Sequence, residues 1–292
     1  MVILLPALCA LLYTGQSVFN KLYSLNYTGP DETITPVFSV IYGLFITLAT
    51  FLFSGLTFCP SATTIYLGLA CGVVLFLYNL SLINASRTGP YAFQSMMMLS
   101  GETIIPLIFS TIWWGDTLGI LSLIGIAVVL VAFVVFNCKG FRFANVKRGY
   151  FFWVALLFCA NGCYGTLMDS QQRIFAGGQR GEMIEISFLF SALISAVYLL
   201  ITQKNHLTAA FSMDKKNWGA VFLSSACAAG AINLLMIALR LVPVSVLFTA
   251  ISGGVLVGCS VLGVLVFHEK LEKQMIWGLV IALIGIVLLS IA

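Results

Sequence analysis

One acidic residue lies inside a long apolar segment of this chain. Glu102 is near the middle of residues 87–114, whose apolar part is long enough to cross a lipid bilayer. An ionised carboxylate at the centre of a membrane helix costs about 2.5–3.5 kcal/mol on insertion scales, so such a group normally faces a cavity or a partner. No Lys or Arg lies near its depth in the linear sequence. Glu102 is therefore the leading candidate for a proton or cation site.

The residues around Glu102 favour a helix that lines a wet cavity. At helical spacing, Tyr91, Gln94 and Met98 share a face with Glu102. Pro106, four residues after Glu102, has no N–H to donate to the Glu102 carbonyl and favours a kink. A polar stripe on a spanning helix is expected to face inward, because lipid offers its side chains no hydrogen bonds.

The apolar segments 2–25 and 148–175 carry similar polar stripes. We expect all of these side chains to lie in one cavity, where Glu102 exchanges a proton and the others orient a solute by hydrogen bonds. A lone amide in a membrane helix can instead join helices at about 0.6 kcal/mol a contact, and that alternative stays open for each Asn. Asp169 and Arg173, four residues apart, are expected to form a structural pair. The expected cavity residues are Glu102, Gln94, Tyr91, Gln16, Asn20, Asn161 and Tyr164.

Composition places the chain among multi-pass membrane proteins. Of its 292 residues, 61% are hydrophobic and only 8% are charged, whereas a soluble domain carries about 25% charged residues. The sequence predicts ten spanning helices separated by Gly, Pro and charged breaks. Their ranges are 2–25, 34–55, 61–85, 88–112, 117–137, 148–175, 182–203, 217–240, 243–267 and 273–291. The fold class expected is an all-α integral membrane protein, and no removed signal peptide is expected at its start.

The chain also repeats itself. At an offset of 153 residues, Pro90 matches Pro243, Gly101 matches Gly254, and an acidic hairpin recurs. The domains expected are a five-helix repeat at 1–138, a basic linker at 139–148 and a second five-helix repeat at 149–292. Because five is odd, two tandem repeats enter the membrane in opposite senses, which is the inverted-repeat plan of many secondary transporters.

The end of each repeat resembles a known family. Residues 267–289, FHEKLEKQMIWGLVIALIGIVLL, and the weaker copy WWGDTLGILSLIGIAVVLV at 113–131 are similar to the repeats of the drug/metabolite transporter superfamily, in its ten-helix EamA-type branch. The resemblance covers essentially the whole chain and implies an alternating-access carrier of a small metabolite or drug. Its motifs identify the fold better than the substrate.

Basic residues predict the orientation. Let side A be the membrane side that carries both termini and side B the other. Side A holds Arg173, Arg180 and Arg240, and side B holds the other eleven of the 14 basic residues. Basic loops favour the cytoplasm, so linker 139–148 is expected to be cytoplasmic and both termini external. We expect a multi-pass protein of the cell membrane, bacterial inner membrane or plasma membrane.

The remaining motifs point away from enzymes and cofactors. The eight cysteines are scattered, the two histidines lie at expected loops, and no HExxH, GxSxG or Walker motif is present. The sequence therefore predicts no metal, no cofactor and no nucleic-acid partner. The expected partners are a cationic or zwitterionic solute, the lipid bilayer and protons as a candidate coupling ion, in a monomer or homodimer. The alternatives are a lipid-modifying membrane enzyme, for which only Asp169/Arg173 and Glu182/Glu185 offer interfacial polar groups, and a non-transporting membrane protein.

Overall fold

The computed structural model describes most of the chain. The described residues are 4–30, 32–88, 91–117, 119–137, 149–176, 178–202, 207, 211, 213–267 and 273–291. Linker 139–148 and Pro90 lie outside them. Some residues within helices have side chains outside the described part, and Tyr91 and Gln94 are among these.

The described residues form ten α-helices at the positions that the sequence predicts, with every boundary within three residues of the expected one. The helices are α1 (Leu4–Asn26), α2 (Ile34–Phe53), α3 (Ala62–Thr88), α4 (Tyr91–Trp113), α5 (Ile120–Asn137), α6 (Tyr150–Phe175), α7 (Arg180–Thr202), α9 (Lys215–Ala238), α10 (Val244–Phe267) and α11 (Lys273–Ile291). The all-α class is confirmed for this part of the chain.

The helices are long and apolar because a bilayer offers no partners for exposed backbone groups. Within the described residues, five helices (α2, α3, α6, α7 and α9) are long and apolar enough to cross a membrane. Four further helices, α4, α5, α10 and α11, contain shorter apolar stretches, among them Met97–Trp113 of α4 and Val246–Leu262 of α10. The fold is that of a helical membrane protein.

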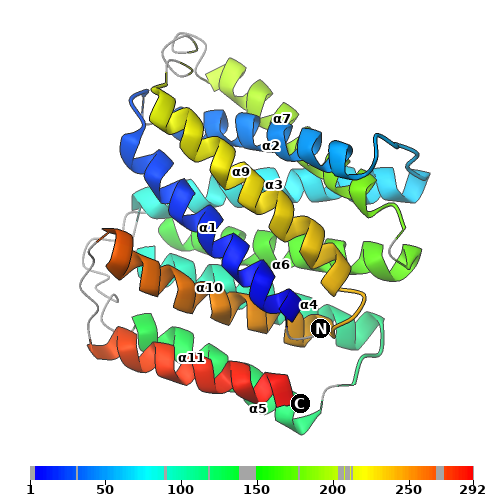
Figure 1. Ribbon diagram of the computed structural model, residues 1–292, viewed down its shortest axis with the longest axis vertical. Helices are drawn as coiled ribbons and strands as arrows, with labels where there is room; N and C mark the ends of the chain where they lie inside the picture. The colour runs from blue at the N-terminus through cyan, green and yellow to red at the C-terminus, as the bar shows by residue number, and fades with distance from the viewer. Residues whose placement is uncertain are drawn as a thin grey trace.

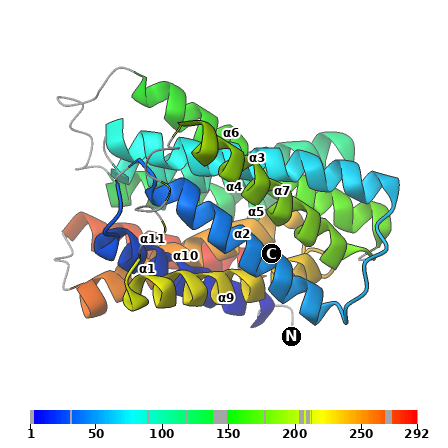
Figure 2. The same ribbon diagram turned by 90° about the horizontal axis from the view of Figure 1, so that it is seen from above.

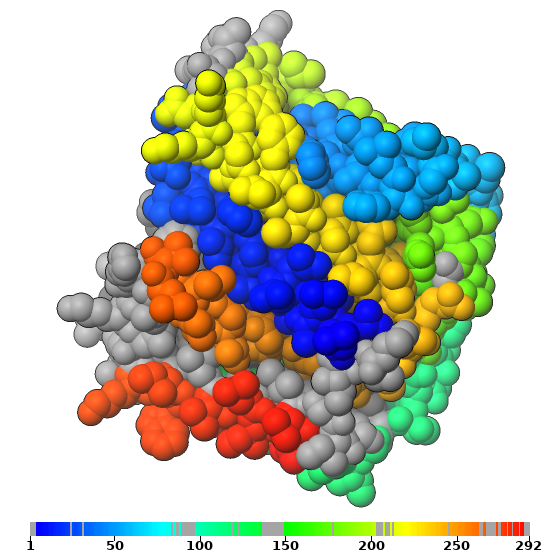
Figure 3. All heavy atoms as spheres, viewed as in Figure 1, coloured from blue at the N-terminus to red at the C-terminus, as the bar shows by residue number. Residues whose placement is uncertain are grey.

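The helices pack in two facing layers (Figures 1 and 2). One layer contains α9, α1 and α10, and the other contains α3, α6 and α4. The pair α2 and α7 closes one edge of the bundle, and the pair α5 and α11 lies at the opposite edge. Figure 3 shows α1 lying along its length between α9 and α10. The two layers therefore enclose the inner faces of α1, α4, α6 and α10.

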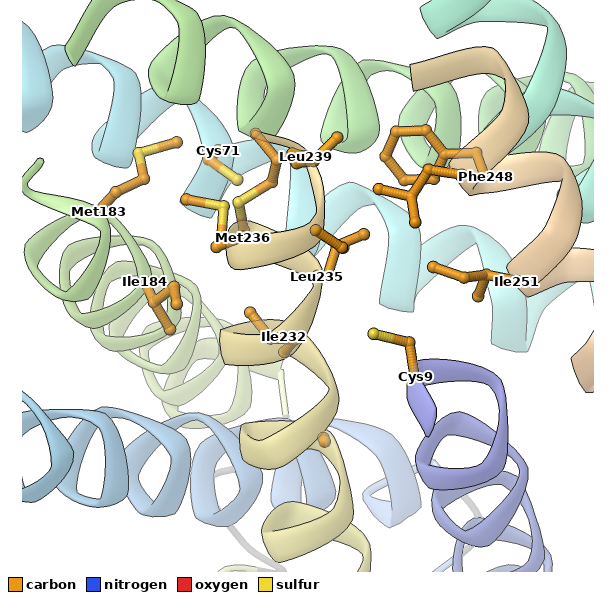
Figure 4. Packing of buried hydrophobic residues seen from close by; sticks show 14 of the residues in the cluster. Cys9, Cys71, Met183, Ile184, Ile232, Leu235, Met236, Leu239, Phe248 and Ile251 are labelled. Atoms are coloured by element: carbon orange, nitrogen blue, oxygen red, sulfur yellow. The ribbon is translucent and has the colours of Figure 1, made fainter. Parts of the chain in front are cut away.

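The main hydrophobic core lies toward the end of the bundle at which α1 begins, which is side A. Its buried members come mainly from α6, α7, α9 and α10, with Cys9 of α1, Ile46 of α2, and Cys71 and Leu75 of α3 (Figure 4). Met236, Leu235 and Phe248 are almost fully buried in it.

Candidate functional site

Glu102 lies where α4, α6 and α10 meet. Its Oε2 atom accepts a hydrogen bond of 3.2 Å from the Ser252 hydroxyl of α10 and a long one of 3.5 Å from Nδ2 of Asn161 in α6. Asn161 Nδ2 also donates to the Met98 carbonyl of α4 at 2.9 Å. Two helices that are distant in sequence, α6 and α10, therefore place donors on one carboxylate oxygen of α4.

The second carboxylate oxygen is left available. Both hydrogen bonds reach Oε2, and no described residue donates one to Oε1 or forms an ion pair with Glu102. The side chain is half-buried, so it remains within reach of a water-sized molecule. This arrangement suits a carboxylate that binds a proton or the positive end of a solute through Oε1.

Two tyrosines lie near the carboxylate, and two more lie near Tyr13. Tyr13 of α1 and Tyr164 of α6 lie close enough to Glu102 to interact with it electrostatically, and Tyr42 and Tyr78 interact with Tyr13 in the same way. All four tyrosines are half-buried. They give the space around Glu102 a polar but uncharged lining, in which hydroxyls can donate to or accept from a solute.

The tyrosines are themselves oriented by neighbouring side chains. Gln16 Nε2 of α1 donates to the Tyr42 hydroxyl of α2 at 2.8 Å, and the Tyr78 hydroxyl of α3 lies 3.2 Å from the Met98 sulfur of α4. Gln16 therefore belongs to the same polar network, although it contacts Tyr42 and not Glu102.

The expected cavity residues divide into three groups. Glu102, Asn161, Tyr164 and Gln16 come together as described. Asn20 instead accepts a 2.5 Å hydrogen bond from Ser224, which joins α1 to α9. Tyr91 and Gln94 lie in α4, but their side chains are outside the described part of the structure.

Ser252, Tyr42 and Tyr78 are not among the cavity residues predicted from the sequence. Ser252 precedes Gly253 and Gly254 in α10, and its position three residues after a Thr gives no signal that it contacts a carboxylate 150 positions earlier. Tyr78 and Tyr42 lie on helices whose polar spacing is irregular, so they stand out only when the helices are packed.

A close helix crossing fixes Glu102 against Asn161. A Cβ atom added to Gly101 would lie 2.3 Å from the Phe158 carbonyl oxygen, and one added to Gly162 would lie 2.6 Å from the Gly101 carbonyl oxygen. Only glycines allow the two backbones to approach this closely. The two glycines directly adjoin the two polar residues, so the crossing sets the distance between Glu102 and Asn161.

A second polar cluster lies at side A. Arg173 donates to both oxygens of Asp116, at 2.9 and 2.5 Å, and its Nε is 2.9 Å from Asp169. The expected Asp169–Arg173 pair is present, and Asp116 from the α4–α5 connection joins it. The indole of Trp114 lies 5.5 Å from the guanidinium carbon. Hydrogen bonds from the Arg173 guanidinium hold the pKa of Asp116 below its ordinary value of 3.8.

The other interfacial acidic residue is also engaged. Glu185 of α7 is buried, and its Oε1 accepts a 3.2 Å hydrogen bond from the Ser54 hydroxyl at the end of α2. Within the part of the chain that the structure describes, no group of three or more His, Cys, Asp or Glu side chains is placed to hold a metal ion.

Comparisons with known proteins identify the fold and nothing finer. No family model and no curated protein matches the chain. A solved structure described only as "Crystal structure of protein" superposes with a TM-score of 0.75, covering 99% of this chain and 97% of its own at 16% identity. At that identity the likeness concerns the arrangement of the helices alone.

Proposed function

We propose that the protein is a secondary active, alternating-access transporter of a small cationic or zwitterionic solute, coupled to protons through Glu102. The observation that carries the proposal is the environment of this residue. A carboxylate between two helix layers has hydrogen-bond donors on one oxygen, and its other oxygen is left available. A buried charge without a basic partner among the described residues is by default a functional group in a membrane protein.

The packing of the two halves supports an inverted repeat. If the five helices of the first half exchange with the five of the second, each contact should have a counterpart. The contact of α1 with α10 corresponds to that of α6 with α4, and the contact of α1 with α9 corresponds to that of α6 with α3. At the two edges, α2 changes places with α7 and α5 changes places with α11, so each of these pairs maps onto itself. This is the pattern that a two-fold axis in the membrane plane produces.

Close contacts at the two crossings support the same relation at the level of residues. One crossing is between α4 and α6, and the other is between α10 and α1. In each of them, two glycines lie against residues of the facing helix. The contacts are Gly101 with Phe158 and Gly162 with Ile105 in one half, and Gly254 with Ala10 and Gly258 with Thr14 in the other. The α4 and α10 positions differ by 153 residues in both contacts, and the α1 and α6 positions differ by 148 in both. Two independent contacts thus obey one pair of offsets.

The remaining parts of the proposal follow from this plan. Membership of the EamA-type branch of the drug/metabolite transporter superfamily accounts for two five-helix halves, and a carrier of this kind belongs in the cell membrane. Under the sequence offset, Glu102 matches Val255, so the carboxylate occurs in one half only. The site is therefore a specialised feature on a shared scaffold.

Proton coupling follows from the chemistry of one carboxyl group. When protonated, Glu102 adds no charge to the cavity as the carrier reorients. When deprotonated, it pairs with an ammonium group. Binding of a cation is therefore expected to strengthen as pH rises through the titration of Glu102, because the charged form is the one that pairs.

The test compares wild type with Glu102→Gln in proteoliposomes, with and without a pH gradient. The amide keeps the size of the side chain and fixes its neutral state. A charge pair at about 4 Å and an effective dielectric constant of about 20 has about 4 kcal/mol of Coulomb energy, and desolvation offsets part of it. We therefore expect cation affinity to fall about tenfold or more, gradient-driven transport to stop, and the pH dependence of binding to flatten.

Glu185→Gln provides the matched control, because it neutralises a buried carboxylate that binds Ser54 and not the cavity. This variant should keep the wild-type pH profile. If a panel of cationic and zwitterionic solutes moves through Glu102→Gln at the wild-type rate and with the wild-type pH profile, Glu102 is a structural carboxyl and the coupling proposal is wrong.

A further inference from the structure

The polar site has a distinct layer of residues next to it on side A. Helices α4 and α6 run toward side A, and α10 runs away from it, because consecutive helices are joined by short connections and alternate in direction. Four residues after Glu102 is Pro106, four after Asn161 is Gly165, and four before Ser252 is Phe248. Four residues are about one helical turn, or roughly 6 Å. The second layer therefore lies one turn closer to side A than the polar one.

Phe248 fills this layer. A Cβ atom added to Gly165 would lie 3.0 Å from Cζ of Phe248 and 3.2 Å from Cγ of Pro106. The tip of the ring thus rests on the α6 backbone beside the α4 proline, at a place where any larger side chain would collide with it. Phe248 is only 1% exposed and belongs to the core cluster of Figure 4.

The layer on the opposite side of the site is less tightly closed. One turn toward side B, Met98 precedes Glu102 and Leu256 follows Ser252, and both are half-buried, whereas Leu157, which precedes Asn161, is buried. By contrast, Pro106, Gly165 and Phe248 are all buried. The floor toward side A is therefore buried on all three helices, whereas the boundary toward side B is half-buried on α4 and α10.

The sequence offsets show that the aromatic ring has no equivalent in the other half. Under the offsets of 153 and 148 residues, Phe248 matches Ser95 and Gly165 matches Ser17. An aromatic residue against a glycine in one half thus corresponds to two serines in the other. The difference places the bulky group on side A.

We propose that Phe248 is the side-A gate of the carrier. In this conformation its ring, seated on Gly165 and Pro106, separates the Glu102 site from side A. In this conformation the site exchanges solute with side B only, and the ring must leave Gly165 before the site opens to side A. The gate rests on the proposed transport function, since a gate has meaning only where a solute passes.

Accessibility of a single thiol tests the gate without a known substrate. Cys259 lies two turns after Ser252 on the same face of α10, on the side-B side of the site, and its half-buried thiol contacts Ser17 of α1. The other seven cysteines are replaced, and a membrane-impermeant thiol reagent is applied from one side at a time to right-side-out and inside-out vesicles. In wild type the thiol should react from side B and resist reagent from side A.

Phe248→Ala should raise the labelling rate of Cys259 from side A about tenfold or more, because removing a buried phenyl ring removes the contacts that favour the closed floor. Labelling from side B should not change. Phe222→Ala, which truncates an exposed phenylalanine of α9, should change neither rate. If side-A labelling of Phe248→Ala stays at the wild-type rate, Phe248 is not the gate.

A second variant covers the case in which Phe248→Ala does not fold. Gly165→Ala pushes the ring tip by a few tenths of an ångström, so side-A labelling should rise in the same direction but less. No rise in a folded Gly165→Ala protein would overturn the proposal. The gate and the proton coupling can be judged separately. If labelling changes but wild type shows no proton-coupled uptake, the gate stands and the coupling is rejected. If wild type shows proton-coupled uptake but labelling does not change, the coupling stands and the gate is rejected.

Discussion

The crossing of α4 and α6 beside the site predicts that Gly101→Ala loosens the bundle where the function resides. The added Cβ would lie 2.3 Å from the Phe158 carbonyl oxygen and 3.0 Å from its Cα atom. Both atoms belong to the backbone, so no side chain can rotate out of the way. The contact falls short of van der Waals distance by roughly 1 Å, and the two helices must separate by about that amount.

The expected cost follows from the overpacking of a dense interior. Extra methyl groups in such places destabilise by about 1–3 kcal/mol. For a domain of this size, 1 kcal/mol shifts Tm by about 2–4 °C, so Gly101→Ala should unfold roughly 2–12 °C below wild type. The same separation would stretch the contact between Asn161 and Glu102, which is already 3.5 Å, beyond hydrogen-bond distance. Cation binding should therefore weaken together with stability.

The assay is thermal unfolding in detergent, followed by size exclusion, beside proton-coupled uptake in proteoliposomes. Gly219→Ala of α9 is the matched control, because no heavy atom lies within 4 Å of its added Cβ. Alanine is favoured over glycine in helices by about 1 kcal/mol, so this control should be as stable as wild type or slightly more stable. A Gly101→Ala protein with wild-type Tm and wild-type pH-dependent uptake would refute the argument that the close crossing holds the site.

Three further predictions concern other parts of the molecule. The pKa of Asp116 lies below its ordinary value, so its pair with Arg173 stabilises the fold above about pH 4, and this stabilisation is lost as pH falls through the folded pKa. Between pH 7 and pH 3, the melting temperature should therefore decline less steeply in Asp116→Asn than in wild type. Equal slopes would contradict the role of the pair. Asn161→Ala removes a donor to a charged group, worth about 1.5–3 kcal/mol, and should weaken cation binding at least about tenfold in a calorimetric titration, whereas unchanged affinity would assign Asn161 to helix packing. Impermeant labelling of single cysteines should find linker 139–148 on the cytoplasmic face and a tag at Ala292 outside, and the opposite result would reverse the orientation.

The positions of the helices could be predicted closely because a bilayer constrains its spanning segments locally. Each spanning segment must satisfy its own backbone hydrogen bonds and hide an apolar surface about 20 residues long. Such segments are visible in the sequence as apolar runs, and their ends as prolines, glycines and charges, such as Pro243 before α10 and Gly149 before α6. The same punctuation predicts an inverted repeat. Its match of Pro90 with Pro243 lies outside the described residues, and the match of Gly101 with Gly254 is supported by the contacts at the two crossings.

The candidate site could be predicted only in part. Glu102, Asn161, Tyr164 and Gln16 were found because an isolated charge and a polar stripe in an apolar helix are unusual in any context. The periodicity of α1 could not distinguish Gln16, which orients Tyr42, from Asn20, which joins α1 to α9, since both lie on the same inward face. The partner of each amide depends on the neighbouring helix.

The sequence by itself determined that this is a helical membrane protein, where its helices begin and end, and which carboxylate is isolated in the apolar segment. These properties depend on residues close together along the chain, acting on the solvent around them. Only the tertiary structure decided that Ser252 donates to Glu102, that Asp116 joins Arg173, and that Phe248 rests on Gly165. Such contacts join residues 57 to 150 positions apart, and their geometry depends on how closely two backbones can approach, which a glycine permits but does not by itself specify.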